Sequence, residues 1–288
     1  MSATILDGKA LSQKLIAELK FEVDRLLKET GKTPRFVNIV VGQDASAASY
    51  GKSQKRAAEA IGIDYQFAYL PQNTTQKELL DQVKFLNENP EVHGVMIHKP
   101  LPAGLDFQKA VNMITADKDL EGMGVANLGK LMLGKTRIIP CTPASAMALL
   151  ASSGVDLSGK DAVIVGRSEI VGKPMMLLLL EKNATVTVCH SGTSRVGRLE
   201  DHIKRAEVLV VAMGKPGFIK GEWIREGAIV IDVGINEVDG KITGDVEFNA
   251  ACGRAGFLTP VPGGVGPVTA VMLMKNGIET FKHQLGKS

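Results

Sequence analysis

The feature that most constrains the fold is an apolar run that breaks into a glycine-containing turn and then resumes. Residues 161–165 (DAVIV) form the first run, residues 166–174 (GRSEIVGKP) the turn, and residues 175–180 (MMLLLL) the second run. This order is typical of a strand, a tight turn and a helix, and it directs backbone N–H groups and a helix N-terminus at one point. A phosphate is stabilised there by the aligned peptide dipoles. Ser168 replaces the second glycine of the G-x-G-x-x-G fingerprint, so the pattern alone is weaker than that fingerprint.

The same alternation of apolar runs and helical patterns extends along the whole chain. Strands are predicted at residues 36–41, 65–70, 94–97, 162–165, 185–189, 208–212 and 228–233. Helices are predicted at residues 7–30, 46–61, 76–87 and 269–283, and Thr75-Gln76-Lys77-Glu78 is a capping box for the third of them. Strands that are apolar throughout are typical of a parallel sheet covered on both faces. The alternation therefore predicts an α/β fold.

Composition narrows the class of protein. The chain has 288 residues, which favours two domains, and its net charge of +3 comes without any Lys/Arg block that would indicate nucleic-acid binding. Cys141, Cys189 and Cys252 lack C-x-x-C spacing, so neither a disulfide scaffold nor a metal site is expected. The apolar segment 175–180 is too short to span a bilayer. We therefore expect a soluble, cytoplasmic protein that binds neither membrane nor metal.

The domain boundary is expected near Pro140-Cys141-Thr142-Pro143. The predicted division is a first domain of residues 1–142 plus a returning C-terminal helix, 269–288, and a second domain of residues 143–268. The second domain is expected to be a Rossmann-like parallel sheet that binds a nucleotide, with a cleft between the two domains.

The end of the second nucleotide-domain strand bears on the choice of cofactor. In such a sheet an acidic residue about 20 positions after the glycines binds the ribose hydroxyls of NAD. Here the strand ends in Val188-Cys189-His190-Ser191-Gly192-Thr193, which contains no carboxylate. Arg167 and Ser191 would then donate hydrogen bonds to a 2′-phosphate, which favours NADP. The alternative interpretation is that Arg167 is a solvated turn residue and Ser191 a helix cap.

Together these motifs resemble those of the bifunctional methylenetetrahydrofolate dehydrogenase/cyclohydrolase family. The resemblance covers nearly the whole chain and rests on segments 98–102 (HKPLP), 117–119 (DKD), 140–143 (PCTP), 166–174 (GRSEIVGKP), 189–193 (CHSGT), 214–217 (GKPG), 231–236 (IDVGIN) and 262–269 (PGGVGPVT). It implies oxidation of 5,10-methylenetetrahydrofolate with NADP, then hydrolysis of the methenyl product to 10-formyltetrahydrofolate. Family members are homodimers built through the nucleotide domain, so the resemblance also implies a homodimer.

The resemblance assigns binding residues position by position. The implied cofactor residues are Gly166, Arg167, Ser168, Ile170, Val171, Gly172, His190, Ser191, Thr193, Gly214 and Ile235. The implied substrate residues are Lys99, Pro100, Leu101, Gly263, Gly264 and Pro267. Glycines in the 262–267 loop permit positive φ and close approach to a flat ring, and Thr269 is expected to cap the helix that follows. In the family this loop lies beside both folate and nicotinamide.

The catalytic positions depart from the family pattern. The family has a Tyr and a Lys four residues apart on one helix, a Gln before Pro-Leu-Pro, and an Asp before a Gly. This chain keeps Tyr50 but has Gln54, His98 and Glu121 at the other three positions. Residues four apart share a helix face, but Gln54 cannot transfer a proton as a Lys can. His98 titrates near neutral pH, or serves only in packing, and Glu121 keeps a negative charge for the pterin ring.

Three functional hypotheses follow. The leading one is an NADP-dependent methylenetetrahydrofolate dehydrogenase whose cyclohydrolase activity is weak or lost. The hydrolysis step depends on proton transfer by the protein, whereas the hydride-transfer step depends mainly on orientation. In the second, His98 takes over proton transfer and both activities remain. In the third, the chain is a diverged paralogue that acts on another substrate or only binds nucleotide.

Overall fold

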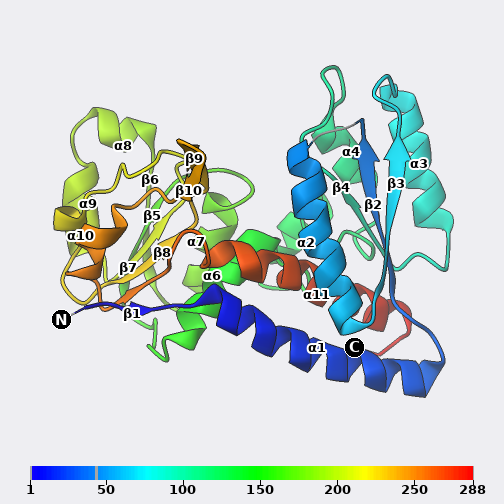
Figure 1. Ribbon diagram of the computed structural model, residues 1–288, viewed down its shortest axis with the longest axis horizontal. Coiled ribbons are helices and arrows are strands. Elements are labelled where there is room, and N and C mark those ends of the chain that lie inside the picture. Colours follow the sequence, from blue (N-terminus) through cyan, green and yellow to red (C-terminus); the bar gives the residue numbers. More distant parts are fainter. Residues whose placement is uncertain (1, 43–44, 288) are drawn as a thin grey trace. The chain divides into compact units, whose positions relative to one another are not determined.

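The fold is described from a computed structural model that covers residues 2–42 and 45–287, with side chains described outside residues 45–50. The chain divides into two compact units. Unit 1 comprises Met1–Ser12 and Thr142–Thr269, and unit 2 comprises Gln13–Cys141 and Ala270–Ser288. Each unit is an α/β structure with its own parallel sheet (Figure 1).

Unit 2 is built on a three-stranded parallel sheet in the order β3-β2-β4. Its strands are β2 (Arg35–Val41), β3 (Asp64–Leu70) and β4 (Gly94–Ile97). Its helices are α1 (Gly8–Thr30, from Gln13 on), α2 (Ala45–Ile61), α3 (Gln76–Glu88), α4 (Phe107–Met113), α5 (Val125–Met132) and α11 (Val265–Gln284, from Ala270 on).

Both faces of this sheet are covered, as the apolar pattern predicts. Phe36 packs with α1, α2 and α11 on one face, and Val37, Ile39 and Val41 pack with α3 and α4 on the other. Figure 1 shows α2 and α3 on opposite sides of the strands. β2 is therefore buried along almost its whole length.

A buried lysine holds the end of α3. The Lys118 ammonium donates hydrogen bonds to the carbonyls of Leu86 (3.1 Å), Asn87 (2.8 Å) and Asn89 (2.7 Å). These carbonyls have no partner within the helix itself because they lie at its C-terminus. Lys118 is 8 % exposed, and burial lowers its pKa from the usual value.

Unit 1 contains a six-stranded parallel sheet in the order β1-β11-β8-β7-β5-β6, which confirms the predicted Rossmann-like sheet. The strands are β1 (Thr4–Ile5), β5 (Asp161–Val165), β6 (Thr185–Cys189), β7 (Val208–Val211), β8 (Ile229–Asp232) and β11 (Phe257–Leu258). β1 pairs with β11, and Met1–Ser12 accordingly belongs to unit 1 rather than to the domain expected from sequence.

Helices and a hairpin complete unit 1. The helices are α6 (Cys141–Ser152), α7 (Gly172–Glu181), α8 (Ser191–Arg195), α9 (Leu199–Arg205), α10 (Phe248–Cys252) and the 3-10 helix η1 (Gly221–Trp223). The hairpin joins β9 (Asn236–Val238) to β10 (Lys241–Thr243). From β5 the chain runs to β6 on one side, and then crosses to β7 on the other side. The carboxyl ends of β5 and β7 therefore form a topological switch point, where nucleotides bind in open α/β sheets.

One detail predicted for the last helix is wrong. Thr269 lies inside α11, where its hydroxyl donates to the carbonyl of Val265 (3.0 Å), so it does not cap that helix. The division between the two units lies between Cys141 and Thr142, within the segment expected as a domain boundary, and α6 begins there with Pro143 in its first turn. A proline is tolerated in a first turn because its missing N–H would have no helical partner there. In the ranges 2–42 and 45–287 no helix is long and apolar enough to cross a membrane.

Candidate functional site

The predicted cofactor residues of unit 1 lie in loops that follow four strands of the sheet. Gly166–Gly172 follows β5, residues 190–193 follow β6, Gly214 follows β7, and Ile235 follows β8. The strands are parallel, so their carboxyl ends meet at one edge. The structure thus brings the predicted cofactor residues to the edge that contains the switch point.

The turn after β5 requires glycine at both ends. Gly166 has φ +141°, and a Cβ there would lie 2.4 Å from the carbonyl oxygen of Ala212. A Cβ on Gly172, at the start of α7, would lie 2.2 Å from the carbonyl oxygen of Gly166. The backbone therefore approaches itself closely at the N-terminus of a ten-residue helix. This arrangement fits a phosphate group, which binds peptide N–H groups and the positive end of the helix dipole.

Side chains inside this turn stabilise it or face solvent. The hydroxyl of Ser168 accepts from the backbone N–H of Val171 (3.1 Å), and the carbonyl of Ser168 accepts from that of Lys173 (3.0 Å). Arg167 and Ile170 are exposed. Arg167 is therefore accessible to a ligand at the same edge, as its predicted role in binding a 2′-phosphate requires.

The loop after β6 forms a capped helix. His190 is the N-cap of α8. Its ring Nδ1 accepts a hydrogen bond from the backbone N–H of Gly192 (3.1 Å), and its backbone N–H donates one to the Thr193 hydroxyl (3.2 Å). Ser191 is the first helical residue, so its interpretation as a cap is wrong. Ser191 is exposed, and β6 ends without a carboxylate.

Two buried carboxylates behind the loops after β7 and β8 were missed by the sequence analysis. Asp245 is 0 % exposed and accepts from the backbone N–H groups of Met213, Gly214 and Lys215. Asp232 ends β8, and burial raises its pKa to about 6. The signal in the sequence is an Asp that closes an apolar strand, followed after a glycine-containing hairpin by a second Asp.

The glycine-rich loop before α11 also belongs to unit 1. Gly263 has φ +111°, which favours glycine, and its carbonyl accepts from the backbone N–H of Gly8 (2.9 Å). A Cβ on Gly8 would lie 1.8 Å from the carbonyl oxygen of Gly264. Pro267 lies in the first turn of α11. The predicted substrate residues are thus divided between unit 1 and the 99–101 segment of unit 2.

In unit 2, Gln54 is held in a buried polar network. Its Oε1 accepts hydrogen bonds from the Tyr65 hydroxyl (2.9 Å) and from Asn38 Nδ2 (3.2 Å). Its Nε2 contacts the sulfur of Met96 at 3.6 Å, and the side chain is 1 % exposed. The network therefore fixes the orientation of the amide. Tyr50 lies on the same helix, but its side chain falls outside the described part of the structure.

His98 joins the same network through Asn38. Asn38 Nδ2 lies 3.3 Å from His98 Nδ1, and His98 is 4 % exposed. The two groups lie within hydrogen-bond distance, and their donor and acceptor roles depend on the tautomer of the imidazole ring. Asn38 is fully buried, and its Oδ1 has no hydrogen-bond partner among the described residues. Asn38 was also missed, because a polar residue inside an apolar strand has no periodic signal.

Glu121 is placed by the carboxylate of Asp119. Asp119 Oδ1 accepts from the backbone N–H groups of Glu121 (3.2 Å) and Gly122 (3.0 Å), and Oδ2 accepts from Gly124 (2.9 Å) and Asn127 Nδ2 (3.0 Å). Desolvation, and after it the nearby charge of Asp119, raise the pKa of Glu121 to about 7, against the opposing effect of the Lys99 charge. Glu121 therefore titrates near neutral pH.

The segment after His98 combines an exposed cation with apolar packing. The Lys99 ammonium lies 3.7 Å from the centre of the Phe107 ring, a favourable cation–π distance. The Lys99–Pro100 bond is cis, and Leu101 packs against the core beneath β4. Lys99 thus has an aromatic partner and lies near enough to Glu121 to favour its charged form.

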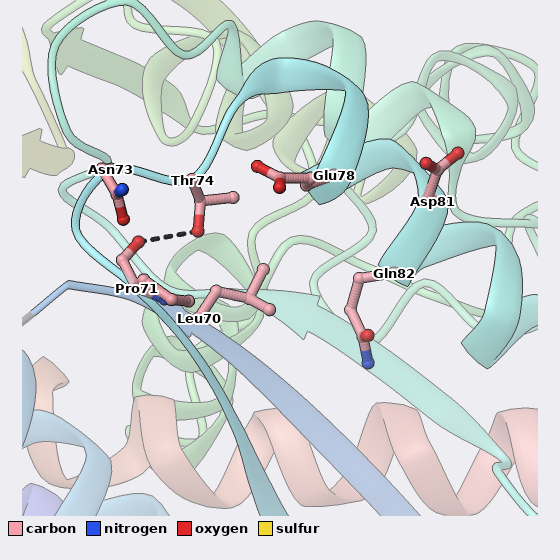
Figure 2. Close-up of a pocket in the computed structure, with 7 residues that line it drawn as sticks. All are labelled: Leu70, Pro71, Asn73, Thr74, Glu78, Asp81 and Gln82. Atoms are coloured by element: carbon pink, nitrogen blue, oxygen red, sulfur yellow. Dashed lines mark hydrogen bonds between the residues drawn. The ribbon is translucent and has the colours of Figure 1, made fainter.

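A separate pocket of about 420 Å³ follows the end of β3 (Figure 2). Its lining contains none of the predicted site residues. Its two carboxylates already have partners, since Glu78 bonds to Thr75 and Asp81 to Lys77. Across the described residues no group of three or more His, Cys, Asp or Glu side chains could hold a metal ion.

Comparison with known proteins gives matches over nearly the whole chain. Residues 6–121 match the catalytic domain, and residues 140–285 the NAD(P)-binding domain, of the tetrahydrofolate dehydrogenase/cyclohydrolase family. A bifunctional protein FolD from Acetivibrio thermocellus is 48 % identical over 286 residues, covering 99 % of both chains.

Two solved structures have the same fold throughout. The bifunctional FolD of Campylobacter jejuni has a TM-score of 0.94 at 41 % identity, covering 98 % of this chain and 99 % of that one. The Trypanosoma brucei FolD, solved with NADP and an inhibitor, has a TM-score of 0.93 at 38 % identity and covers 99 % of each chain. The chain therefore belongs to the tetrahydrofolate dehydrogenase/cyclohydrolase family.

Proposed function

We propose that the chain is an NADP-dependent 5,10-methylenetetrahydrofolate dehydrogenase whose methenyltetrahydrofolate cyclohydrolase activity is weak or lost. The observation that carries the proposal is the buried amide at position 54. Its oxygen is saturated by Tyr65 and Asn38, and neither its oxygen nor its nitrogen transfers a proton at neutral pH. The two activities place different demands on this position.

Hydride transfer depends mainly on the orientation of the substrate carbon relative to the nicotinamide ring of NADP. When NADP is bound, this ring would accept the hydride. A fixed amide at position 54 is compatible with this step. Hydrolysis of the methenyl carbon requires an activated water and a protonated amine, so it needs a titratable group. The replacement by Gln54 therefore reduces the second activity more than the first.

The remaining site residues have the following proposed roles. Glu121, in its ionised form, binds the N–H groups of the pterin ring, and Tyr50 orients the substrate. The Gly263-Gly264 backbone and the 99–101 segment provide further substrate contacts. The turn after β5 binds the pyrophosphate of NADP, and exposed Arg167 and Ser191 bind its 2′-phosphate. The resemblance to the family also implies a homodimer, and a sedimentation measurement of the molecular mass in solution would test this oligomeric state.

The primary experiment measures the two activities separately in purified protein. Methylenetetrahydrofolate and NADP are mixed while NADPH and methenyl absorbance are followed, and authentic methenyltetrahydrofolate is then supplied alone. We expect reduction of NADP with accumulation of the methenyl product, and hydrolysis close to the uncatalysed rate. Failure to reduce either NADP or NAD would overturn the proposal and favour a paralogue with another substrate.

Gln54→Lys tests the role of position 54 directly. The variant restores a group that can carry a proton, so we expect cyclohydrolase activity to increase roughly tenfold or more. Gln66→Lys, the same change at an exposed position of β3, is the matched control and should leave both activities unchanged. Equal hydrolysis by wild type and Gln54→Lys would contradict the assignment.

The second candidate function retains both activities through His98. It is favoured by the contact of His98 with Asn38, which links the ring to Gln54. In that case the wild type hydrolyses methenyltetrahydrofolate with a histidine-like inflection in its pH profile. His98→Gln would then remove both the inflection and the hydrolysis while dehydrogenase activity remains.

A further inference from the structure

The buried carboxylate of Asp245 joins two separate loops of the nucleotide edge. Oδ2 accepts from the backbone N–H groups of Met213 (2.6 Å) and Gly214 (3.0 Å), and Oδ1 accepts from that of Lys215 (2.7 Å). Oδ1 also accepts from Asn236 Nδ2 (2.9 Å), which belongs to the segment after β8. One side chain therefore connects the loops that follow β7 and β8.

A second carboxylate keeps Asp245 in place. Asp232 Oδ1 accepts from the backbone N–H groups of Asp245 (3.1 Å) and Gly234 (2.9 Å), and Oδ2 accepts from that of Val246 (2.9 Å). The surroundings leave no room for movement. A Cβ on Gly234 would lie 2.3 Å from the Asp245 carboxyl carbon, and one on Gly244 would lie 2.0 Å from Asp232 Oδ2.

The position of this pair relates it to the cofactor rather than to general stability alone. Gly214 and Ile235, two predicted cofactor residues, lie on the two loops that Asp245 joins. The three peptide N–H groups of residues 213–215 point to Asp245, so they are engaged by the protein and not by a ligand. Asp245 itself is 0 % exposed and cannot contact a bound cofactor.

We propose that Asp245 is a positioning residue of the cofactor site, which fixes the loops after β7 and β8 in the arrangement that binds NADP. The inference rests on the proposed cofactor role of this edge. A carboxylate suits the task because it accepts on both oxygens, and each accepting bond to a charged group is stronger than one between neutral groups. Loss of the bonds frees two loops and lowers the fraction of protein in the binding arrangement.

Asp245→Asn is the first test. Asparagine keeps the shape but accepts on only one oxygen, so its NH₂ group faces two N–H donors whichever way the amide is turned. We expect the Kd of NADP, titrated by fluorescence with no folate present, to rise roughly tenfold or more. The KM for methylenetetrahydrofolate at saturating NADP should stay within about twofold. A folded variant with wild-type Kd for NADP, or with both constants changed equally, would overturn the inference.

Asn236→Ala provides a milder variant in case Asp245→Asn does not fold. It removes the bond to the second loop while the three backbone bonds remain, so we expect the NADP Kd to rise about threefold to fivefold. Amide hydrogen exchange at Gly214 and Lys215 should stay protected in this variant and accelerate in Asp245→Asn. Glu237→Gln, an exposed change on β9, is the control and should alter neither Kd nor exchange. An unchanged NADP Kd in folded Asn236→Ala also overturns the inference.

The direct NADP titration separates this inference from the proposed function. Wild type that binds NADP but does not oxidise methylenetetrahydrofolate would contradict the proposed function, and the Asp245 variants would still be judged by their NADP Kd. Wild type that oxidises the substrate while Asp245→Asn binds NADP normally would contradict only the positioning role.

Discussion

The two units build their sites from different parts of the polypeptide. In unit 1 the nucleotide edge consists largely of peptide groups, shaped by Gly166 and Gly172 and held from behind by Asp245. In unit 2 the proposed site is made of side chains, namely the buried Gln54 and His98 and the carboxyl group of Glu121. A site of peptide groups keeps its chemistry when side chains vary, provided the backbone path is preserved. A site of side chains changes its chemistry at every substitution.

This contrast bears on the three positions of unit 2 at which the resemblance implies other residues. The motifs at the nucleotide edge determine a backbone shape, which Gly166 and Gly172 require. Positions 54, 98 and 121 are the ones to which we assign proton transfer and ring binding, and the resemblance implies a Lys, a Gln and an Asp there. The comparison predicts that unit 1 responds mainly to changes of backbone shape, and unit 2 mainly to changes of functional group.

The largest expected effect comes from Gly166→Val. The added side chain meets the Ala212 carbonyl and must adopt φ +141°, which costs about 2 kcal/mol or more in strain. We expect the NADP Kd to increase roughly 100-fold, because the turn that fits the phosphates must move. Gly129→Ala on α5, with nothing within 4 Å of the new Cβ, is the control and should not weaken binding. Normal NADP binding by Gly166→Val would break the comparison.

Arg167→Ala sharpens the comparison, because Arg167, together with Ser191, is a side chain of unit 1 to which we assign ligand chemistry. Removal of a charge-assisted donor to the 2′-phosphate should raise the KM for NADP about tenfold and leave the KM for NAD nearly unchanged. Steady-state kinetics with both nucleotides measure the ratio. Lys173→Ala, which removes an exposed cation of the same turn, is the control. Equal increases in the KM for NADP and in the KM for NAD would show that Arg167 stabilises the turn rather than binds the 2′-phosphate.

Glu121 gives unit 2 a pH dependence that a site of peptide groups cannot have. Its folded-state pKa of about 7 lies above the usual 4.5, mainly because of desolvation. Stability contributed by this group is therefore fully present below pH 4.5 and is lost as pH rises through 7. Substrate binding has the opposite sign: the ionised form binds the pterin, so the KM for methylenetetrahydrofolate should increase several-fold as pH falls from about 8 to about 6.

Two variants test the pH prediction. Glu121→Gln should remove the inflection, and Lys99→Met should move it to higher pH because the positive charge lowers the pKa of Glu121. Glu91→Gln, an exposed glutamate of the same unit, should leave the profile unchanged. An inflection that survives Glu121→Gln assigns it to another group.

The smallest effect concerns the network around Gln54. Tyr65→Phe removes the hydroxyl that donates to Gln54 and contacts the sulfur of Met96, so the free energy of unfolding should fall by about 1 kcal/mol. Urea denaturation measures the change. Tyr69→Phe on the same strand is the control, because Tyr69 is 71 % exposed and should shift stability by less than about 0.5 kcal/mol. Equal changes in the two variants would mean that the network does not hold Gln54.

The sequence predicts the regular elements well, because periodicity and caps are local signals. β4 and β6 have the predicted bounds, and the Thr75 capping box is confirmed in full. The two-residue strands β1 and β11 have no periodicity, and their pairing depends on contacts far apart in the chain. The N-terminal segment was consequently assigned to the wrong unit.

The side-chain environments could not be predicted for a related reason. Asn38 and Tyr65 look like ordinary strand residues in sequence, and only the pairing of β2 with β3 and β4 brings them to Gln54. Asp245 follows a hairpin without apolar periodicity, and its backbone partners at residues 213–215 lie about thirty residues away in the chain. Position and partner of such groups are tertiary properties. The roles of the predicted site residues remain predictions that the variants above test.

The ammonium of Lys118 shows how narrow the choice of side chain becomes at a buried junction. Three carbonyl oxygens converge on one nitrogen, and a tetrahedral ammonium can donate to all of them. A guanidinium spreads its donors over a plane and is larger, so Lys118→Arg keeps the charge but loses the convergence. The next residue, Asp119, accepts a hydrogen bond from the backbone N–H of Glu121 and so stabilises the turn that contains Glu121. A displaced Lys118 therefore disturbs the path of the chain at this turn. A substitution usually regarded as conservative thus cannot reproduce the three hydrogen bonds that converge at position 118.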